Sequence, residues 1–264
     1  MICQCYALLL TTYHLRRTNK CNSGSYFTNI NQTDGGIYLD PLIRNTQDVF
    51  DGTRSRLLWI DDNPPTCTMT YSEIQPDKTS SHHIHDWEHE VFIIKGAGTL
   101  VCDGKEYPVK AGDAMFIPPN VDHYTLNNGG EGVIQRIEVN PLIAAQSGGA
   151  QNDGGEGTGQ PPVIRNISEI DQSDGPARKV IDINDGAIHY TMSFRSLDPN
   201  STAPKHSHAG EHVGFVLEGT VILSVDGADY VAKEGDLALV PSTSEHEWRS
   251  NSTSRAAWLV FNPI

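Results

Sequence analysis

The stretch Thr79-Ser-Ser-His-His-Ile-His-Asp-Trp-Glu-His89 returns later in the chain as Thr202-Ala-Pro-Lys-His-Ser-His-Ala-Gly-Glu-His212. Both stretches carry three histidines at the same spacing, followed at a fixed distance by a glycine. Self-similarity at a fixed offset is the signature of a duplicated structural unit, and it has to be recognised before single elements are assigned. This pair of stretches therefore decides how the rest of the sequence is interpreted.

The match extends on both sides of the two histidine stretches. Further along, each copy has an Asp-Gly pair, a Gly-Asp pair, a proline and a fourth histidine at the same offset. The corresponding positions are Gly96 and Gly219, Asp103-Gly104 and Asp226-Gly227, Gly112-Asp113 and Gly235-Asp236, Pro118 and Pro241, and His123 and His246. The chain therefore contains two copies of one domain.

The boundaries of the copies follow from where the match begins and ends. Ile43-Arg-Asn45 corresponds to Ile164-Arg-Asn166, and Val139-Asn-Pro-Leu142 corresponds to Phe261-Asn-Pro-Ile264. We predict a first domain at residues 42–145, a second domain at residues 163–264, and an N-terminal extension at residues 1–41. Residues 146–162 are rich in glycine, which is typical of a flexible linker.

Short apolar runs bounded by glycine and turn residues indicate strands in each copy. Val91-Phe-Ile-Ile94 and Thr99-Leu-Val-Cys102 are examples, and Asp103-Gly104 is typical of a type I′ hairpin turn. No stretch of 12 residues has a convincing helical apolar period. We therefore expect an all-β chain with two tandem small barrels or sandwiches.

The eight repeated histidines point to metal chemistry. Residues i and i+2 of a strand face the same side, so His83 and His85 are expected to converge, as are His206 and His208. Four neutral imidazoles in one barrel suit a divalent transition metal such as Mn, Fe, Co, Ni, Cu or Zn. The predicted metal ligands are His83, His85, His89, His123, His206, His208, His212 and His246.

These motifs resemble the cupin superfamily, specifically its two-domain members, the bicupins. The first cupin motif, G(x)5HxH(x)3-4E(x)6G, corresponds to His83-x-His85-x3-His89-x6-Gly96 and to its repeat. The second, G(x)5PxG(x)2H(x)3N, corresponds to Gly112-x5-Pro118-x4-His123-x3-Asn127 and to its repeat. Three positions depart from the pattern. The usual glutamate ligand is replaced by His89 and His212, the motif glycine by Asn120 and Thr243, and the final asparagine of the second copy by Ser250.

The resemblance implies a double-stranded β-helix, or jelly roll, in each half, with one metal inside each barrel. Histidine in the glutamate position is similar to a cupin subgroup with four-histidine manganese or iron sites, so Mn or Fe is preferred. Glu90 could also be taken as the glutamate ligand. His89 keeps the spacing to Gly96 and is retained in the second copy, where Val213 follows it, so we interpret His89 as the ligand.

The sequence offers fewer candidates for catalytic groups than for metal ligands. Glu88 and Glu211 directly precede the third ligand of each set. They could orient a ligand imidazole or cap a solvated turn, and the sequence favours neither. Gln135 lies on the last expected strand of the first unit, where the second unit has Ala257. We therefore list Glu88, Gln135 and Glu211 as candidates.

The composition narrows the class of partner. With 19 Lys and Arg against 33 Asp and Glu, the net charge is −14, which disfavours binding to nucleic acid or to an anionic membrane surface. We expect a small-molecule substrate, and self-association through sheet faces into a homo-oligomer is left open. Five cysteines without a CxxC pair favour reduced thiols and a cytoplasmic location, although the acid-poor start is also typical of an organelle transit segment.

Three functions fit these features. The first is a metal-dependent oxidoreductase, such as a dioxygenase that acts on a small organic substrate. The second is a non-oxidative cupin enzyme (an isomerase, cyclase, lyase or aminohydrolase) that uses the metal as a Lewis acid. The third is a cupin that binds a small ligand without catalysis. The fold does not choose among them.

Overall fold

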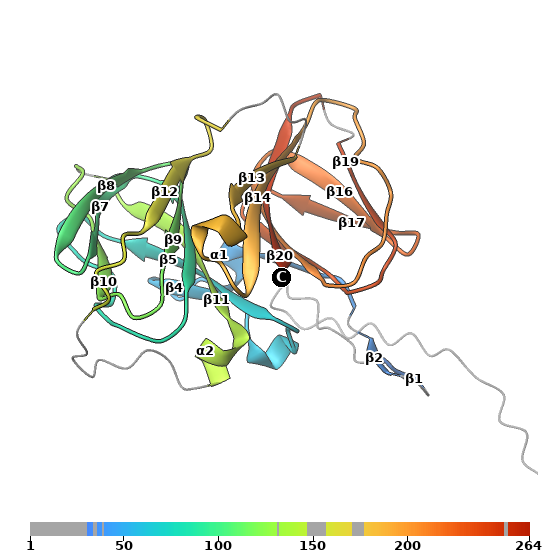
Figure 1. The fold of residues 1–264 in the computed structure, drawn as a ribbon. Coiled ribbons are helices and arrows are strands. Elements are labelled where there is room, and N and C mark those ends of the chain that lie inside the picture. Colours follow the sequence, from blue (N-terminus) through green and yellow to red (C-terminus); the bar gives the residue numbers. More distant parts are fainter. Residues whose placement is uncertain are drawn as a thin grey trace, which may run out of the picture.

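The structure is a computed structural model that describes residues 31–33, 36–38, 40–130, 132–146, 157–170, 177–250 and 253–264. Two β-barrels lie side by side, one green to yellow and one orange to red in Figure 1. The predicted all-β fold with two tandem jelly-roll barrels is confirmed. Most of the predicted extension and residues 147–156 of the predicted linker lie outside the described residues.

Barrel 1 is built from the first repeat, where a larger and a smaller sheet face each other. Its strands are β4 (Arg54–Leu58), β5 (Cys67–Ile74), β6 (His89–Lys95), β7 (Ala97–Cys102), β8 (Lys105–Lys110), β9 (Asp113–Ile117), β10 (His123–Leu126) and β11 (Ile134–Pro141). The larger sheet contains β9, β6, β11, β5 and β4, and the smaller one has the order β10-β7-β8. The short helices α1 (Thr46–Val49), η1 (Ile60–Asp62) and α2 (Leu142–Gln146) connect or flank these strands.

Barrel 2 repeats this arrangement with the second copy. Its strands are β13 (Ala177–Ile181), β14 (Tyr190–Leu197), β15 (His212–Glu218), β16 (Thr220–Val225), β17 (Ala228–Lys233), β18 (Asp236–Val240), β19 (His246–Arg249) and β20 (Ala256–Pro263), with η2 (Ile183–Asp185) after β13. A separate pair, β1 (Asn31–Thr33) and β2 (Gly36–Tyr38), precedes both barrels.

The predicted hairpin turns occur in both barrels. Asp103 and Gly104 have φ values of 46° and 72°, and Asp226 and Gly227 have 48° and 82°. Each pair forms a two-residue loop, between β7 and β8 and between β16 and β17. A positive φ at both loop positions defines the type I′ turn, whose twist matches that of the flanking strands. The short Asp-Gly signal in the sequence is thus sufficient to locate these hairpins.

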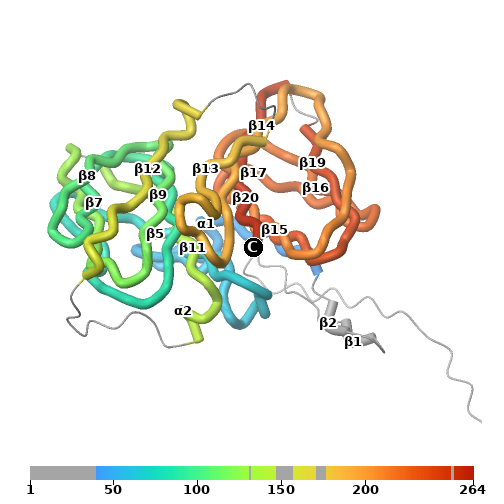
Figure 2. The backbone as a smooth tube through the Cα atoms, viewed as in Figure 1, coloured from blue at the N-terminus to red at the C-terminus, as the bar shows by residue number. Residues whose placement is uncertain are grey.

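The barrels exchange their first strands. The strand β3 (Leu42–Asn45), from the start of the first repeat, pairs with β18 of barrel 2. The strand β12 (Val163–Asn166), from the start of the second repeat, pairs with β9 of barrel 1. Figure 1 and the tube in Figure 2 both show β12 beside β9 on the green barrel. Residues 42–145 and 163–264 therefore describe the sequence repeat, while each folded barrel contains one strand from the other copy.

Polar side chains fix both exchanged strands. In β12, the Asn166 Nδ2 donates to Asp113 Oδ1 at 2.7 Å and to the Ala111 carbonyl at 3.1 Å. In β3, the Asn45 Nδ2 donates in the same way to Asp236 Oδ1. Each exchanged strand also has an arginine that forms a bidentate ion pair with an aspartate in the 3₁₀ helix of its own repeat. The pairs are Arg44–Asp62 and Arg165–Asp185.

The apolar core also crosses between the barrels. One cluster joins buried side chains of both halves, among them Phe92, Tyr190, Phe215 and Phe261, and a separate smaller cluster fills each barrel. Cys67 and Cys102 are buried, and both thiols are free. Because a shared core and two exchanged strands join the barrels, we treat the two halves as one folding unit.

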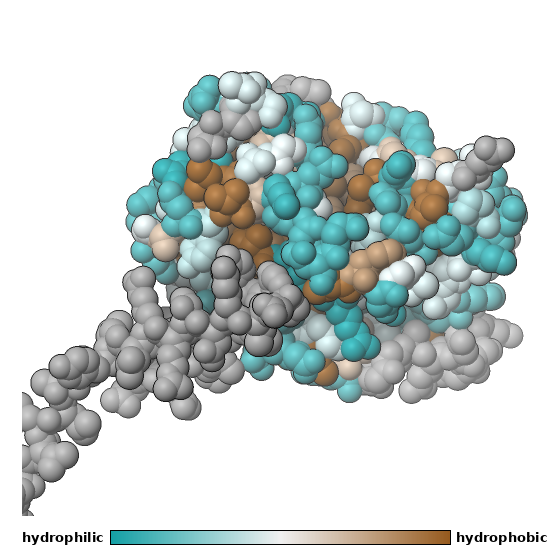
Figure 3. Space-filling view, turned by 180° about the vertical axis from the view of Figure 1, so that it is seen from behind, coloured by the Kyte–Doolittle hydropathy of each residue, from teal (hydrophilic) through white to brown (hydrophobic). Residues whose placement is uncertain are grey.

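The surface hydropathy can be followed on one face of the molecule. The face shown in Figure 3 is largely hydrophilic, with several separate apolar areas. Within the described residues, none of the helices has the length and apolar character needed to span a membrane.

The exchanged strand generates a stability prediction. Asn166→Ala removes both hydrogen bonds that the Asn166 amide donates and leaves the buried Asp113 carboxylate with one donor fewer. We expect the free energy of unfolding in urea to fall by about 1–3 kcal/mol, the typical cost of unsatisfied buried polar groups. Asn184→Ala, at an exposed position of η2, is the matched control and should change it by less than about 0.5 kcal/mol. Equal effects of the two substitutions would contradict a role of Asn166 in fixing β12.

Candidate metal centres

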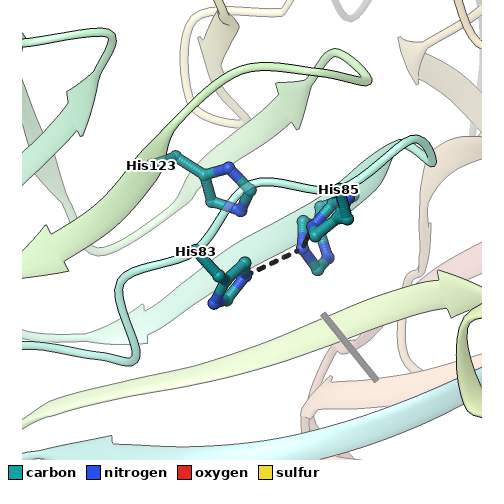
Figure 4. Close-up of side chains that lie close together, drawn as sticks. His83, His85 and His123 are labelled. Carbon is teal, nitrogen blue, oxygen red and sulfur yellow. Dashed lines mark hydrogen bonds between the residues drawn. The ribbon is translucent and has the colours of Figure 1, made fainter. Parts of the chain in front are cut away.

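Four histidines of barrel 1 converge on one point. The set consists of His83, His85, His89 and His123, and one ligand nitrogen from each lies within 4.8 Å of those of the others. His89 begins β6 and His123 begins β10, while the other two lie in the extended segment before β6. In Figure 4, His83, His85 and His123 point toward a common centre.

A backbone bridge brings the distant histidines together. His83 and His123 pair as an isolated antiparallel bridge: the His83 amide donates to the His123 carbonyl at 3.2 Å, and the His123 amide donates back at 3.0 Å. The expectation of a continuous strand through His83 and His85 is wrong in this detail, because only isolated bridges form there. The extended backbone still places both side chains on one side.

Burial keeps these imidazoles neutral. It lowers the pKa of His85 to about 4 and that of His123 to about 3. Burial also lowers the pKa of His83, and lowers that of His89 well below its usual value. Neutral imidazole is the form that binds a metal. Near neutral pH the set therefore offers four neutral nitrogen donors.

The hydrogen bonds of the rings are consistent with a metal centre. The His123 Nδ1 lies 2.7 Å from the Val121 carbonyl, so Nδ1 carries the proton and the lone pair of Nε2 is free. That buried Nε2 has no hydrogen-bond partner among the described residues. The Nε2 atoms of His85 and His89 lie only 2.5 Å apart. Neutral nitrogen donors that crowd together in this way, with the buried Nε2 of His123 left without a partner among the described residues, fit a divalent transition metal.

Barrel 2 contains the equivalent group. His206, His208, His212 and His246 also place one ligand nitrogen each within 4.8 Å of the others. The Nδ1 atoms of His206 and His246 lie 2.8 and 2.9 Å from backbone carbonyls, which leaves both Nε2 atoms free. Burial lowers the pKa of His212 to about 3. This group is less enclosed than the first, because His206 is exposed.

The geometry favours the histidine over the glutamate at the third ligand position. His89 belongs to the converging set, whereas Glu90, the next residue of β6, faces the opposite side of the sheet. Glu90 is fully buried, and burial raises its pKa well above the usual value. Neither of its oxygens has a hydrogen-bond partner among the described residues. Glu90 is thus a carboxyl group of the core whose burial favours the neutral form.

Glu88 and Glu211 join the two barrels. The Glu88 carboxylate accepts hydrogen bonds from the amides of Ile188 and His189, at 3.0–3.2 Å, just before β14 of barrel 2. Glu211 accepts a hydrogen bond from the Thr66 hydroxyl, just before β5 of barrel 1. Both glutamates are buried, so the alternative that they cap solvated turns is wrong. Each one fastens the ligand turn of its barrel to the opposite half of the chain.

Gln135 faces away from the histidines. Its Nε2 donates to Glu73 Oε1 at 3.0 Å, and its neighbour on β11, Arg136, points to the other side. Along β11, Arg136, Glu138 and Asn140 alternate onto the face that carries the site. The two copies therefore do differ at these positions, but the side chain that lines the cavity is that of Arg136 rather than Gln135.

Barrel 1 has a cavity of about 730 Å³ that reaches the histidines. Three ligand candidates, His83, His85 and His89, line it. Trp87 lines it as well, and its ring stacks on that of His85 with centroids 4.3 Å apart. A volume of this size is typical of sites for small organic ligands. The cavity therefore connects a candidate metal centre with room for a substrate.

Sequence reasoning missed Glu138 and Arg54. The Glu138 carboxylate lies 3.2 Å from the Arg136 guanidinium and 3.9 Å from His89 Nδ1. Burial opposes its charge, but the neighbouring Arg136 holds the pKa of Glu138 below its usual range. Arg54, on β4, lines the same cavity. A comparison of the two copies could have pointed to these residues. Barrel 2 has Val260 at the position of Glu138 and Ala177 at the position of Arg54.

An aromatic stack occupies the corresponding part of barrel 2. Trp248 and Trp258 are both buried and stack with ring centroids 5.0 Å apart. In barrel 1 the equivalent residues are Thr125 and Arg136, whose side chains lie 3.4 Å apart. A buried polar pair in one barrel, of which Arg136 lines the cavity, thus corresponds to a buried aromatic stack in the other.

Comparison with known proteins agrees with the fold and the site. A model of the Cupin domain matches residues 70–135 and 193–262, which together make up just over half of the chain. The matched segments contain strands from both barrels, and all eight candidate histidine ligands lie within them. The chain belongs to the cupin family, and the two matches make it a bicupin.

Solved structures with the same architecture include two enzymes. Salicylate 1,2-dioxygenase from Pseudoaminobacter salicylatoxidans superposes with a TM-score of 0.64 at 15% identity, over 84% of this chain and 81% of that one. Oxalate decarboxylase from Bacillus subtilis superposes with a TM-score of 0.66 at 13% identity, over 83% and 76%. At these identities the likeness shows the fold alone.

Curated relatives match a smaller part of the chain. The HTH-type transcriptional regulator PuuR of Escherichia coli is 26% identical over 96 residues, which are 35% of this chain and 52% of that protein. An uncharacterized protein of Methanocaldococcus jannaschii is 35% identical over 52 residues, which are 20% of this chain and 42% of that protein. The chain therefore spans about half the length of the curated relatives it matches, or less.

The two histidine sets predict the metal stoichiometry. Protein loaded with Mn(II) or Fe(II) should contain two equivalents of metal per chain by elemental analysis. His206→Ala combined with His246→Ala should reduce this to one equivalent, because two of the four donors in barrel 2 are lost. A single equivalent in the wild-type protein, unchanged in the double variant, would mean that barrel 2 holds no metal.

The third ligand position predicts a contrast between neighbouring residues. His89→Ala should reduce the metal content of barrel 1 strongly, because it removes one of four donors from a buried centre. Glu90→Gln should leave it unchanged, since a neutral amide replaces a neutral acid on the opposite face of β6. Elemental analysis of both variants, made in the His206→Ala/His246→Ala background, isolates barrel 1. Retention of metal by His89→Ala and its loss in Glu90→Gln would restore the glutamate as ligand.

Proposed function

We propose that this bicupin is a metal-dependent enzyme that acts on a small organic substrate in barrel 1, as a dioxygenase with Mn or Fe. The observation that carries the proposal is the cavity of about 730 Å³, which is lined by three of four converging histidines. The structural likeness to a dioxygenase supports it only at the level of the fold.

The donor set limits the choice of metal. Four imidazoles without a carboxylate suit Mn(II), Fe(II), Co(II), Ni(II), Cu(II) or Zn(II), and do not suit Mg(II) or Ca(II), which prefer oxygen. When bound, Mn or Fe supplies coordination positions for substrate and dioxygen beside the four histidines. The chain would hold it through His83, His85, His89 and His123 in barrel 1 and through His206, His208, His212 and His246 in barrel 2.

The surrounding residues prepare the site. Glu138 lies beside the outer nitrogen of His89 and carries a negative charge that stabilises this ring as a donor. Arg136 balances the charge of Glu138 at 3.2 Å, so the buried carboxylate does not have to be protonated. The stacked Trp87 fixes the His85 ring and separates it from solvent. These contacts hold the ligands in position and leave the cavity side open to substrate.

The barrels differ enough to have separate roles. Barrel 1 has the lined cavity and charged groups close to the histidines, whereas the Trp248–Trp258 stack fills the corresponding space in barrel 2. Orienting a polar substrate requires a few well-placed polar contacts. We therefore place catalysis in barrel 1, and assign to the metal of barrel 2 the stabilisation of the folded state by binding to it.

Oxygen uptake tests the type of reaction. Purified protein with known metal content is screened in an oxygen electrode against enolizable diketones and hydroxylated aromatic compounds. Uptake that depends on both metal and substrate supports the dioxygenase. Metal-dependent turnover without uptake would replace it by the non-oxidative alternatives. Tight ligand binding without turnover would favour the third function, for which the partial match to a transcriptional regulator is the supporting observation.

The division of roles predicts opposite effects of two matched double variants. His83→Ala combined with His85→Ala should abolish turnover and leave the metal of barrel 2 bound. His206→Ala combined with His208→Ala should lower the thermal midpoint by several degrees, because the folded state loses a ligand, and should retain most of the activity. Turnover rates and melting curves are measured on the same preparations. A barrel 2 variant that is folded but inactive would reverse the assignment.

A further inference from the structure

We propose that the barrel 1 cavity selects an organic anion, a small carboxylic acid in its ionised form, and that Arg54 is the residue that recognises its charge. This inference rests on the proposed function of barrel 1 and adds the chemical class of the substrate. It starts from an unusual local charge: three arginines line this cavity, although the chain has a net charge of −14.

Two of these arginines, Arg54 and Arg136, belong to one cross-strand row of the larger sheet, with Ser72 between them. Arg54 of β4 is the cross-strand partner of Ser72 on β5, which is in turn the partner of Arg136 on β11. All three side chains line the cavity. Directly opposed residues on one face of a sheet lie about 4.5–5.5 Å apart at Cβ. Arg54 is exposed and Arg136 is buried, so Arg54 lies closer to solvent along this row.

The next two rows add three neutral polar side chains, Thr70, Thr68 and Asn140. Thr70 lies between two charged residues, opposite Arg56 on β4 and opposite Glu138 on β11. Thr68 and Asn140 form the following row. All of them line the cavity.

Two of these groups are ready to bind a ligand. The buried Thr68 Oγ1 and Asn140 Oδ1 have no hydrogen-bond partner among the described residues. A buried polar atom is costly when it stays unpaired. The Thr68 hydroxyl can donate to a ligand oxygen, whereas Asn140 Oδ1 only accepts and therefore needs a ligand donor such as a hydroxyl group. A hydroxylated organic acid carries both kinds of group.

The charges of the cavity do not cancel. Arg136 is paired with Glu138 at 3.2 Å. The other carboxylate, Glu73, accepts hydrogen bonds from the Tyr71 hydroxyl at 2.7 Å and from Gln135.

The two remaining arginines keep their positive charge. Among the described residues, Arg54 and Arg56 form no ion pair. Arg56 lies over the Trp59 ring at 4.4 Å, whereas Arg54 has no such contact. The guanidinium of Arg54 thus lines the cavity without a close ion pair among the described residues, although its charge also favours the ionised form of Glu138. A planar carboxylate matches its paired donors.

The second barrel lacks this arrangement. Ala177 stands where barrel 1 has Arg54, and Trp258 where it has Arg136. In barrel 2 an arginine, Arg195, occupies the position that corresponds to Ser72, and it is the cross-strand partner of Trp258. Arg195 is therefore the natural control, because it is the corresponding charge in the barrel to which we assign no substrate.

Calorimetry with matched ligand pairs tests the inference. The probes are benzoate with benzamide and malonate with malonamide, since each amide keeps the shape and removes the charge. They are titrated into metal-free and Mn(II)-loaded full-length protein. At least one carboxylate should bind with a Kd at least 10-fold lower than that of its amide, in both metal states. Arg54→Gln should raise this Kd about 10-fold and leave the amide unaffected, and Arg54→Lys should restore part of the difference.

The controls separate this inference from the proposed function. Arg195→Gln should leave the Kd of the carboxylate unchanged, and circular dichroism should show every variant folded. The inference is overturned if neither carboxylate binds, if amide and carboxylate bind equally, or if Arg195→Gln has the larger effect. It is also overturned if the preference needs Mn(II) and survives Arg54→Gln, because the metal would then recognise the anion. These readouts need no turnover, so an inactive protein with Arg54-dependent binding would refute only the proposed enzyme activity.

Discussion

Four imidazole nitrogens within 4.8 Å of one another can coexist only when the rings are neutral and their orientations are fixed. In barrel 1, burial removes the proton from the rings, and the backbone carbonyl beside His123 directs its free nitrogen inward. The bridge between His83 and His123 brings together residues that are 40 positions apart in the sequence. The jelly roll is thus the scaffold that holds these four rings close together and buries most of their surface.

The same constraint explains why the two barrels are joined so closely. The ligand turn of each barrel ends in a glutamate, Glu88 or Glu211, that is fastened to the opposite half of the chain. The exchanged strands β3 and β12 and the shared apolar cluster add to this connection. A ligand turn that is held on both sides loses less conformational entropy when a metal or substrate binds, which is the general advantage of preorganisation.

Duplication has allowed the copies to diverge around an unchanged centre. The eight histidines are retained, but Arg136 and Thr125 of barrel 1 are replaced by the stacked Trp258 and Trp248 of barrel 2. Barrel 2 has Arg195 on the neighbouring strand β14 instead of an arginine at the position of Arg136, and it has Val260 at the position of Glu138. One barrel therefore has a cavity with charged walls and the other an aromatic interior.

The sequence by itself determined the duplication, the all-β class, the Asp-Gly hairpins and the eight converging histidines, because these depend on spacing and on local turn chemistry. It could not show the strand exchange, since β3 and β12 have the same local sequence whichever barrel they join. It also misjudged Gln135 and overlooked Arg54 and Glu138. Which face of β11 meets the site is decided by the register with β5 and β6, and a shift of one residue would reverse it. Only the tertiary structure, which sets that register and packs the barrels together, decided which polar side chains line the cavity.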